Sequence, residues 1–389
     1  MQTLHGYTLD ETQWKAKGGG GLCNTATKGG KKYFIKRLTS PKYPESDKFT
    51  GEFKRQQIEK CDAWVKYRKE IIKALPGNGT GTLIKPIEYF RDGPCYYEVA
   101  NMVDVTSIPY DRIWKESKQD KARIMLTVAM SLSDMHKVGV VHGDLDPGNI
   151  LISRAAGGNL VTKLIDFTDS FFEKNPPETI MSKDFWWSPE VALFSKASEQ
   201  NPNPYRQYIS CKADVFSLGI VFHQYCAKDG KAPICTKPQP WQEFQIGKKP
   251  QISSEIEPEF RELISSMLEV EPDNRPSMAE VHKALLHILR PVSALGGADI
   301  QRERQSSESK KEYVPHDFGK AKRREESYNG LDAVPSSASI KTGNAKNSNG
   351  ASVREVLILN PRKVKVCFSD GKEQIMDLKL AIRQGYAKE

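Results

Sequence analysis

Three polar side chains stand at spacings that suit the transfer of a phosphoryl group. Asp144 and Asn149 lie five residues apart in VVHGDLDPGNILI, and Asp166 follows in LIDFTD. Phosphoryl transfer needs a carboxylate that orients the attacking hydroxyl, and it needs oxygen ligands that hold magnesium. The adjoining apolar runs ILI and KLI are typical of short strands, which would hold these side chains rigidly. The ordered set therefore indicates a phosphotransferase.

A lysine and a run of glycines add features that suit nucleotide phosphates. Lys36 ends the apolar run in YFIKRL, so a strand is expected to hold its ammonium group. The preceding stretch GGGGLCN can bring backbone N–H groups close to phosphates. Gly19 and Gly21 match the first two glycines of the pattern G-x-G-x-x-G. Asn24 replaces the third glycine, and because asparagine tolerates left-handed backbone this loss is mild; Ala26 stands where the motif has valine.

The elements that must position these groups divide the chain into a β-rich part and an α-rich part. Residues 6–40 contain short β-type runs broken by glycines, and strands are predicted again near 83–90 and 96–99. Between them, apolar residues from 47 to 75 recur at roughly helical spacing until Pro76 ends the pattern. After residue 100, helical patterns predominate.

Six motifs in sequence resemble those of the eukaryotic-type (Hanks-type) protein kinase superfamily. The similar pairs are FIK and VAIK, HGDLDPGN and HRDLKPxN, DFT and DFG, WSPE and APE, DVFSLG and DxWSxG, and NRPSMAEV and the late RPS segment. The resemblance covers about residues 7–290. It implies an α+β, bilobal fold, with a β-rich N-lobe at about 7–100 and an α-rich C-lobe at about 101–290.

The resemblance also implies cofactors and roles for individual residues. ATP and Mg²⁺ are the implied cofactors. Lys36 is expected to pair with the nucleotide phosphates, and Asp144 to act as the catalytic base. Asn149 and Asp166 are the implied magnesium ligands.

Further residues are assigned to scaffold roles by the same resemblance. Asp214 is expected to brace the catalytic loop. Glu190 and Arg275 are expected to form a buried structural ion pair.

The remaining cofactor contacts come from a helix and from the segment CYYEVANM. Glu70 is the predicted partner of Lys36, with Glu59 as the reserve. In CYYEVANM, Val99 is predicted to guard the deeper pocket. Ala100 and Met102 are predicted to lie where backbone groups hold adenine.

Three positions depart from the kinase pattern in ways that bear on activity. Gly143 replaces the arginine of HRD, which in the family gathers an activation-segment phosphate, so we expect activity without phosphorylation there. Thr168 replaces the glycine of DFG and restricts flipping of that segment. Asp146 replaces a lysine that in Ser/Thr kinases neutralises charge on the transferring phosphoryl group, and aspartate has the opposite sign.

These departures leave three hypotheses. The first is a Ser/Thr protein kinase, which is favoured by Pro147 and by WSPE, DVFSLG and NRPS. The second is a kinase for an amine-bearing small molecule, because HGDLxPGN is close to aminoglycoside and choline kinase loops; Asp146 would then contact the amine. The third is a pseudokinase scaffold, against which Lys36, Asp144, Asn149 and Asp166 are all present.

Composition limits the other classes. The 389 residues are 38% hydrophobic and 28% charged, without an apolar run of membrane-spanning length or an apolar leader, so a cytoplasmic protein is expected. The net charge of +9 accompanies no basic-aromatic module, so neither nucleic acid nor membrane is an expected partner. Seven scattered cysteines are read as free thiols.

The C-terminal part differs in composition from the rest. Residues 291–350 are polar and serine-rich, which predicts a disordered linker that could be an autophosphorylation target; a role in solubility alone is the alternative. Residues 351–389 form a small segment, in which KVKVCFSDGKEQIMDL alternates around SDG as in a hairpin.

Overall fold

The computed structural model places most of the chain. It describes residues 2–16, 21–45, 51–77, 81–103, 107–155, 157–180, 182–198, 203–231, 234–235, 239–244, 248, 250–290, 339–340, 352–358, 363–370, 373–377 and 386. Gly19 of the predicted glycine loop and all but residues 339–340 of the predicted linker lie outside this set.

The N-terminal lobe is built on an antiparallel sheet of seven strands. Its members are β1 (Thr3–Leu4), β2 (Tyr7–Leu9), β3 (Lys15–Ala16), β4 (Gly21–Lys28), β5 (Lys31–Leu38), β6 (Pro86–Asp92) and β7 (Cys95–Asn101). They are ordered β1-β2-β4-β5-β7-β6, and β3 pairs with β4. Gly29 and Gly30 join β4 to β5, and both adopt the positive φ that such a tight hairpin turn requires.

The two faces of this sheet have different tasks. Ile35, Tyr97 and Val99 belong to a buried apolar cluster on one face. Successive strand residues point to opposite faces, so Lys36 and Glu98 project from the other one. That second face forms the roof of the cleft described below.

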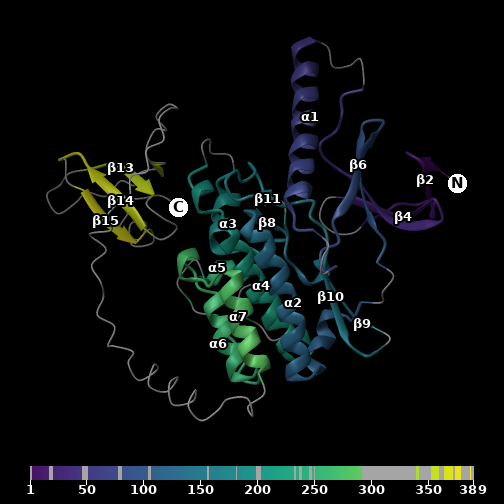
Figure 1. The fold of residues 1–389 in the computed structure, drawn as a ribbon. Helices are drawn as coiled ribbons and strands as arrows, with labels where there is room; N and C mark the ends of the chain where they lie inside the picture. Colours follow the sequence, from purple (N-terminus) through teal and green to yellow (C-terminus); the bar gives the residue numbers. More distant parts are fainter. Residues whose placement is uncertain are drawn as a thin grey trace.

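A long helix, α1 (Gly51–Ala74), stands beside the sheet (Figure 1). Trp64 of α1 packs against Tyr89 and Tyr96 of the sheet, with ring centroids 6.2 and 5.5 Å apart. The helix ends two residues before Pro76, as predicted, because proline cannot continue the backbone hydrogen bonding.

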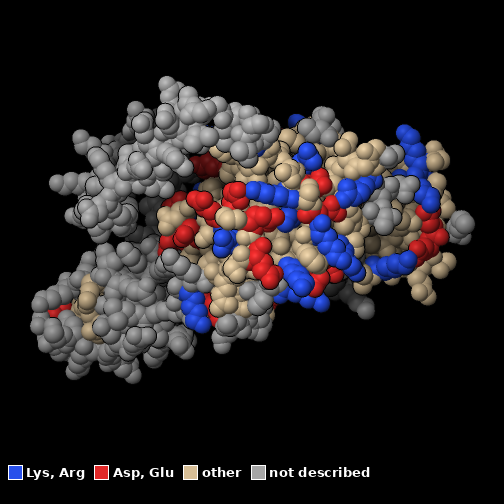
Figure 2. All heavy atoms as spheres, turned by 90° about the horizontal axis from the view of Figure 1, so that it is seen from below, with Lys and Arg blue, Asp and Glu red and all other residues tan. Residues whose placement is uncertain are grey.

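The second lobe is helical (Figure 1). Its helices are η1 (Tyr110–Lys115), α2 (Lys118–Lys137), α3 (Pro189–Lys196), α4 (Cys211–Cys226), α5 (Trp241–Phe244), α6 (Pro258–Met267) and α7 (Met278–Leu289), with short turns η2 (Pro147–Asn149), η3 (Asp184–Trp186), η4 (Arg206–Tyr208), η5 (Lys228–Gly230) and η6 (Pro272–Asn274). Ser117 caps α2 by accepting from the Asp120 N–H, and Ser277 with Glu280 forms a capping box on α7. Basic and acidic side chains are interspersed on the face seen in Figure 2.

Two short antiparallel pairs carry the polar residues singled out in the sequence. β8 (Val140–Val141) pairs with β11 (Phe171–Phe172), and β9 (Ile150–Arg154) pairs with β10 (Leu160–Leu164). The loop from 142 to 149 therefore connects β8 to β9, and Asp166 follows β10 by two residues.

The C-terminal strands form a separate antiparallel sheet. It contains β12 (Ser339–Ile340), β13 (Val353–Ile358), β14 (Lys363–Phe368) and β15 (Glu373–Asp377), in that order. β14 and β15 pair across the SDG sequence, and β12 is a strand inside the segment expected to be linker. Val366 and Phe368 belong to the same buried apolar cluster as Phe194 and Ile209 of the helical lobe. In the described part of the chain, no helix has the length and apolar character needed to cross a membrane.

Candidate active site

A buried aspartate on α4 fixes the loop that carries the catalytic candidates. Asp214 accepts hydrogen bonds from the backbone N–H groups of His142 (2.7 Å) and Gly143 (3.0 Å). It also contacts the His136 ring nitrogen Nε2 at 2.9 Å. Burial alone would raise the pKa of Asp214, but the interactions with His136 and His142 hold it below its usual value. The carboxylate is thus charged and braces the loop.

Asp144 and Asn149 come together within this loop. The Asn149 side-chain nitrogen Nδ2 donates to Asp144 Oδ2 (3.0 Å) and to the Asp144 carbonyl (2.7 Å). Burial and the neighbouring Asp146 raise the pKa of Asp144. Because Asn149 uses its nitrogen in this way, its carbonyl oxygen is the atom that can face a metal ion.

Lys36 reaches across from the sheet to the segment after β10. Its ammonium donates to both Asp166 carboxylate oxygens (2.9 and 3.0 Å) and to Thr168 Oγ1 (3.0 Å). Burial alone would lower the pKa of Lys36, but Asp166 and Glu98 outweigh burial and raise it. A Cβ added at Gly21 would lie 2.8 Å from Lys36 Cε, so the lysine side chain passes directly over that glycine.

Asp166 itself holds an unusual backbone conformation. Its φ is +63°, in the left-handed region that non-glycine residues seldom adopt. Such conformations persist where surrounding contacts enforce them, often at functional sites. Here the ion pair with Lys36 and a hydrogen bond from Thr168 Oγ1 to Oδ1 (2.8 Å) hold the carboxylate toward the cleft.

A cleft between the two lobes brings these residues together. It is lined by Phe34, Lys36, Ile84, Glu98, Ala100, Asn101, Met102, Val103, Leu151, Ile165 and Asp166. Apolar walls with a cation and a carboxylate at one end suit a planar base that carries phosphates. Asn149 and Asp166 supply oxygen ligands, and Mg²⁺ commonly takes only one or two such protein ligands beside phosphate oxygens and water. The residues therefore fit ATP with Mg²⁺.

A second ion pair links the segment after the cleft to the helical core. Glu190 receives two hydrogen bonds from Arg275, at 2.6 and 2.8 Å, and both side chains are fully buried. The predicted structural pair is confirmed.

A comparison with known families decides the membership of the chain. The model of the protein kinase domain matches residues 48–286, which is more than half of the chain. The chain belongs to the protein kinase domain family. The two lobes, the braced loop and the cleft are thus the kinase fold and its nucleotide site.

Curated relatives are similar to this kinase domain at low identity. "Putative serine/threonine-protein kinase R436" of Acanthamoeba polyphaga mimivirus is 30% identical over 42% of the chain and 55% of its own length. Calcium-dependent protein kinase 27 of Arabidopsis thaliana is 27% identical over 57% of the chain and 45% of its own length. Wee1-like protein kinase 1-A of Xenopus laevis is 27% identical over 50% of the chain and 34% of its own length. The chain thus matches about half, or less, of each relative.

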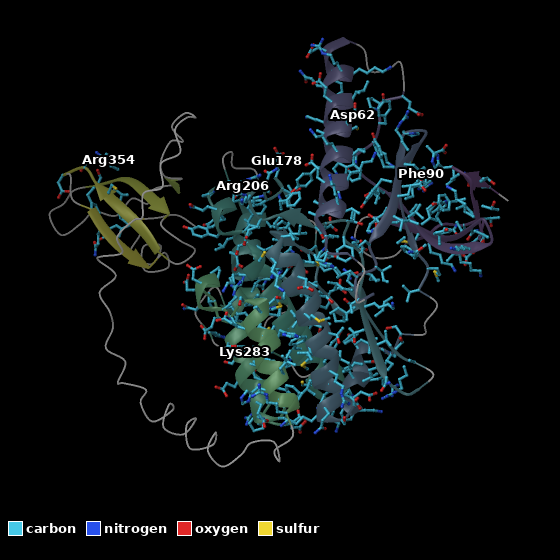
Figure 3. The ribbon with its side chains drawn as sticks, in the orientation of Figure 1. Asp62, Phe90, Glu178, Arg206, Lys283 and Arg354 are labelled. Atoms are coloured by element: carbon cyan, nitrogen blue, oxygen red, sulfur yellow. The ribbon has the colours of Figure 1, made fainter. Side chains whose placement is uncertain are left out.

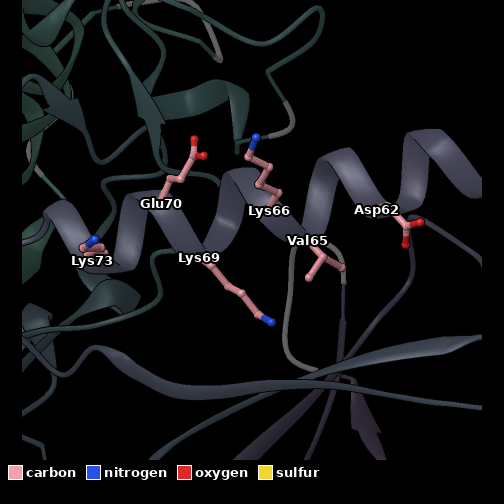
Figure 4. Close-up of a pocket in the computed structure, with 6 residues that line it drawn as sticks. All are labelled: Asp62, Val65, Lys66, Lys69, Glu70 and Lys73. Atoms are coloured by element: carbon pink, nitrogen blue, oxygen red, sulfur yellow. The ribbon is translucent and has the colours of Figure 1, made fainter.

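The predicted glutamate partner of Lys36 was wrong. Glu70 is exposed on α1, where it lines a surface hollow with Lys66, Lys73 and other residues of the same helix (Figure 4). The reserve, Glu59, is also exposed and lies 4.0 Å from Arg55. The helical phase of α1 turns these glutamates toward solvent, so neither can reach Lys36.

An arginine takes the inward position on α1 of this kinase. Arg68 is buried and donates to the carbonyl of Ser170 (2.6 Å) and to that of Phe167. Its guanidinium also lies near Tyr89 and Glu98, and it influences the pKa of both. The helix therefore binds the backbone just after Asp166 directly, and no α1 glutamate mediates the contact.

The carboxylate beside Lys36 comes from β7 instead. Glu98 lies opposite Lys36 in the sheet register, accepts from the Tyr89 hydroxyl (2.5 Å) and accepts from Thr168 Oγ1 (3.3 Å). Burial and the nearby Asp166 raise its pKa. Sequence reasoning missed this residue, although a glutamate inside the apolar run CYYEVANM was a usable signal.

The prediction for Val99 was wrong by one strand position. Val99 pairs with Ile35 and is buried in the apolar cluster on the opposite face of the sheet. A shift of one residue in a strand moves a side chain to the other face. Glu98, one position earlier, lines the cleft; Ala100 and Met102 line it as well.

The same one-residue error affected the glycine motif. Asn24 lies inside β4 without a positive φ, and its amide donates to the Glu11 carbonyl (2.8 Å). Ala26 is buried in the apolar cluster on the far face. Cys23 is the β4 residue opposite Lys36, so it shares the face of the cleft. Neither Asn24 nor Ala26 faces the nucleotide site.

The activation segment, residues 166–190, is held by several contacts. Arg206 donates to the carbonyls of Pro176 and Pro177, close to Glu178 on the same side of the helical lobe (Figure 3). The Trp187 ring nitrogen donates to Ser182 Oγ at 2.8 Å. These contacts use neutral groups or backbone carbonyls in the segment.

Gly143 has a geometric reason to be glycine. Its φ is +81°, and a Cβ there would lie 2.7 Å from the Asp169 carbonyl oxygen and 3.1 Å from the Phe171 ring. The loop and the activation segment approach too closely for any side chain. An arginine at this position would require the segment to move.

Proposed function

We propose that this kinase domain transfers the γ-phosphate of ATP to serine or threonine hydroxyls of proteins. The observation that carries the proposal is the convergence of Lys36, Asp144, Asn149 and Asp166 at one cleft. Support for a protein acceptor comes from the ordered activation segment and from the names of the relatives, two of which are Ser/Thr kinases or kinase-like proteins by name.

The residues divide the work as follows. Bound ATP with Mg²⁺ supplies the phosphoryl group and neutralises much of its charge. Asp144 orients the acceptor hydroxyl and receives its proton, and a raised pKa suits a base that must work near neutral pH. Asn149 and Asp166 hold the metal through oxygen atoms, and Lys36 binds phosphate oxygens from the sheet. Asp214 keeps the loop in place.

The proposal is tested by assaying the purified protein with labelled ATP and Mg²⁺, alone and with casein as a generic acceptor. Label is expected on protein in the wild type, and the variant Asp144→Asn is expected to lose it while still binding ATP. Transfer only to added small amines would replace the proposal with the small-molecule kinase. Tight nucleotide binding without any transfer would support the scaffold.

Activation-segment phosphorylation is proposed to be unnecessary. The double variant Thr179→Ala, Ser182→Ala is expected to keep a casein phosphorylation rate within about twofold of the wild type, since losing exposed or half-buried hydroxyls has small effects. Support comes from Gly143, which replaces the phosphate-gathering arginine, and from the contacts of Arg206. A folded, ATP-binding but inactive double variant would contradict this expectation.

A further inference from the structure

A buried carboxylate beside the catalytic base holds a lysine of the activation segment. Asp146 is 2% exposed, and its Oδ2 lies 2.5 Å from Lys183 Nζ. Its other oxygen, Oδ1, accepts from the Gly148 N–H at 2.6 Å. Both oxygens of this acid therefore have partners within the protein, and the ion pair joins the catalytic loop to the activation segment.

The ammonium of Lys183 lies over the catalytic loop. A Cβ added at Gly148 would be 3.9 Å from Lys183 Nζ, so the absence of a side chain there leaves room for the cation. Asp144 is two residues before Asp146, and its pKa responds to burial, to Asp146 and also to Lys183. The side chain of Lys183 is 42% exposed, so the cation remains open to a ligand.

This placement answers a chemical need of the reaction. Negative charge is spread over the transferring phosphoryl group, and fixed cations near it stabilise the transition state. Lys36 lies at the sheet side of the cleft, on Asp166. Lys183 lies at the other side, next to the base.

We propose, on the basis of the kinase function above, that Lys183 contacts the transferring phosphoryl group and that Asp146 positions it. The acid at position 146 is then the anchor of a cation that a different segment supplies. The pair also fastens the activation segment beside Asp144 without a phosphate. An amine of a small substrate has no free oxygen of Asp146 to bind, because Lys183 and Gly148 use both.

The experiment compares charge removal with charge exchange. In the casein assay, Lys183→Ala is expected to lower kcat about 100-fold, the loss typical of one stabilising group, with a smaller change in KM for ATP. The exchange variant Asp146→Lys, Lys183→Asp rebuilds the pair in reverse and is expected to recover most of kcat. Lys174→Ala removes an exposed lysine of the same segment and should leave kcat unchanged.

A second variant and a second readout separate charge from tethering. Asp146→Asn, Lys183→Gln replaces the ion pair with two amides that can still hydrogen bond. Proteolysis of the nucleotide-free protein within the activation segment reports tethering; it should accelerate in Lys183→Ala and return toward the wild-type rate in both double variants. Wild-type kcat in the amide pair, or in Lys183→Ala, would overturn the proposal while leaving the kinase function intact. A wild-type protein that transfers no phosphate would overturn both.

Discussion

Replacing Arg68 with methionine is expected to lower the free energy of unfolding by about 3 kcal/mol, because the guanidinium is buried and charged. The substitution leaves the carbonyls of Phe167 and Ser170 without their donor. It also removes a cation from the neighbourhood of Glu98. The backbone after Asp166 then loosens, and kcat is expected to fall about tenfold, since small displacements of catalytic groups are costly. Urea unfolding and the casein assay measure the two effects.

A second substitution distinguishes lost charge balance from lost packing. Adding Glu98→Gln to Arg68→Met removes the carboxylate whose pKa burial already raises, so part of the lost stability should return. Arg55→Met provides the control on the same helix, because Arg55 is exposed and its pairing with Glu52 is worth little. Equal stability of the Arg68 and Arg55 variants would show that the inward arginine is not a structural anchor.

Much of the fold could be predicted because local patterns and tertiary packing agree. The run KKYFIKRL coincides with β5 (Lys31–Leu38), and the predicted amphipathic stretch 123–136 lies within α2 (Lys118–Lys137). In both, one apolar face meets a core, which makes the period of the sequence visible. β12 was missed because two residues give no period to read.

The catalytic set could be predicted because its spacing is fixed by short local elements. Asp144 and Asn149 share one loop, and Asp166 follows the adjacent strand. The errors at Val99, Asn24 and Ala26 have a different origin. Each depends on strand register, where a one-residue slip exchanges the two faces and composition offers little to detect it.

The charged partners could not be predicted because each depends on contacts between distant segments. Lys36 meets Glu98 across two strands, and Asp146 meets Lys183 across 37 positions. In both cases the sequence shows a residue that departs from the family pattern, but the compensating residue lies in another element. A pattern read along the chain assigns a role to one position at a time, whereas buried charges are balanced as a group.

The largest loss of stability is expected from Arg275→Met, which should lower the free energy of unfolding by about 3 to 5 kcal/mol. The substitution leaves Glu190 fully buried with no counter-charge. It also removes the donor to the carbonyls of Glu269 (2.7 Å), Lys212 (2.9 Å) and Val270 (2.9 Å). Urea denaturation followed by circular dichroism measures the change. Arg123→Met, an exposed arginine paired with its helical neighbour Asp120, should change stability by less than about 1 kcal/mol.

Adding Glu190→Met to Arg275→Met separates the ion pair from the carbonyl contacts. Removal of both charges abolishes the cost of an unpaired carboxylate, so the double variant should be more stable than Arg275→Met alone. Recovery should nevertheless stop short of the wild type, because three backbone carbonyls still lack the donor that Arg275 supplied. Full recovery would mean that those carbonyls find other donors and that the guanidinium serves Glu190 alone. No recovery would place the main cost in the carbonyl contacts and in the packing of Arg275 over the Phe216 ring, 4.8 Å from its centre.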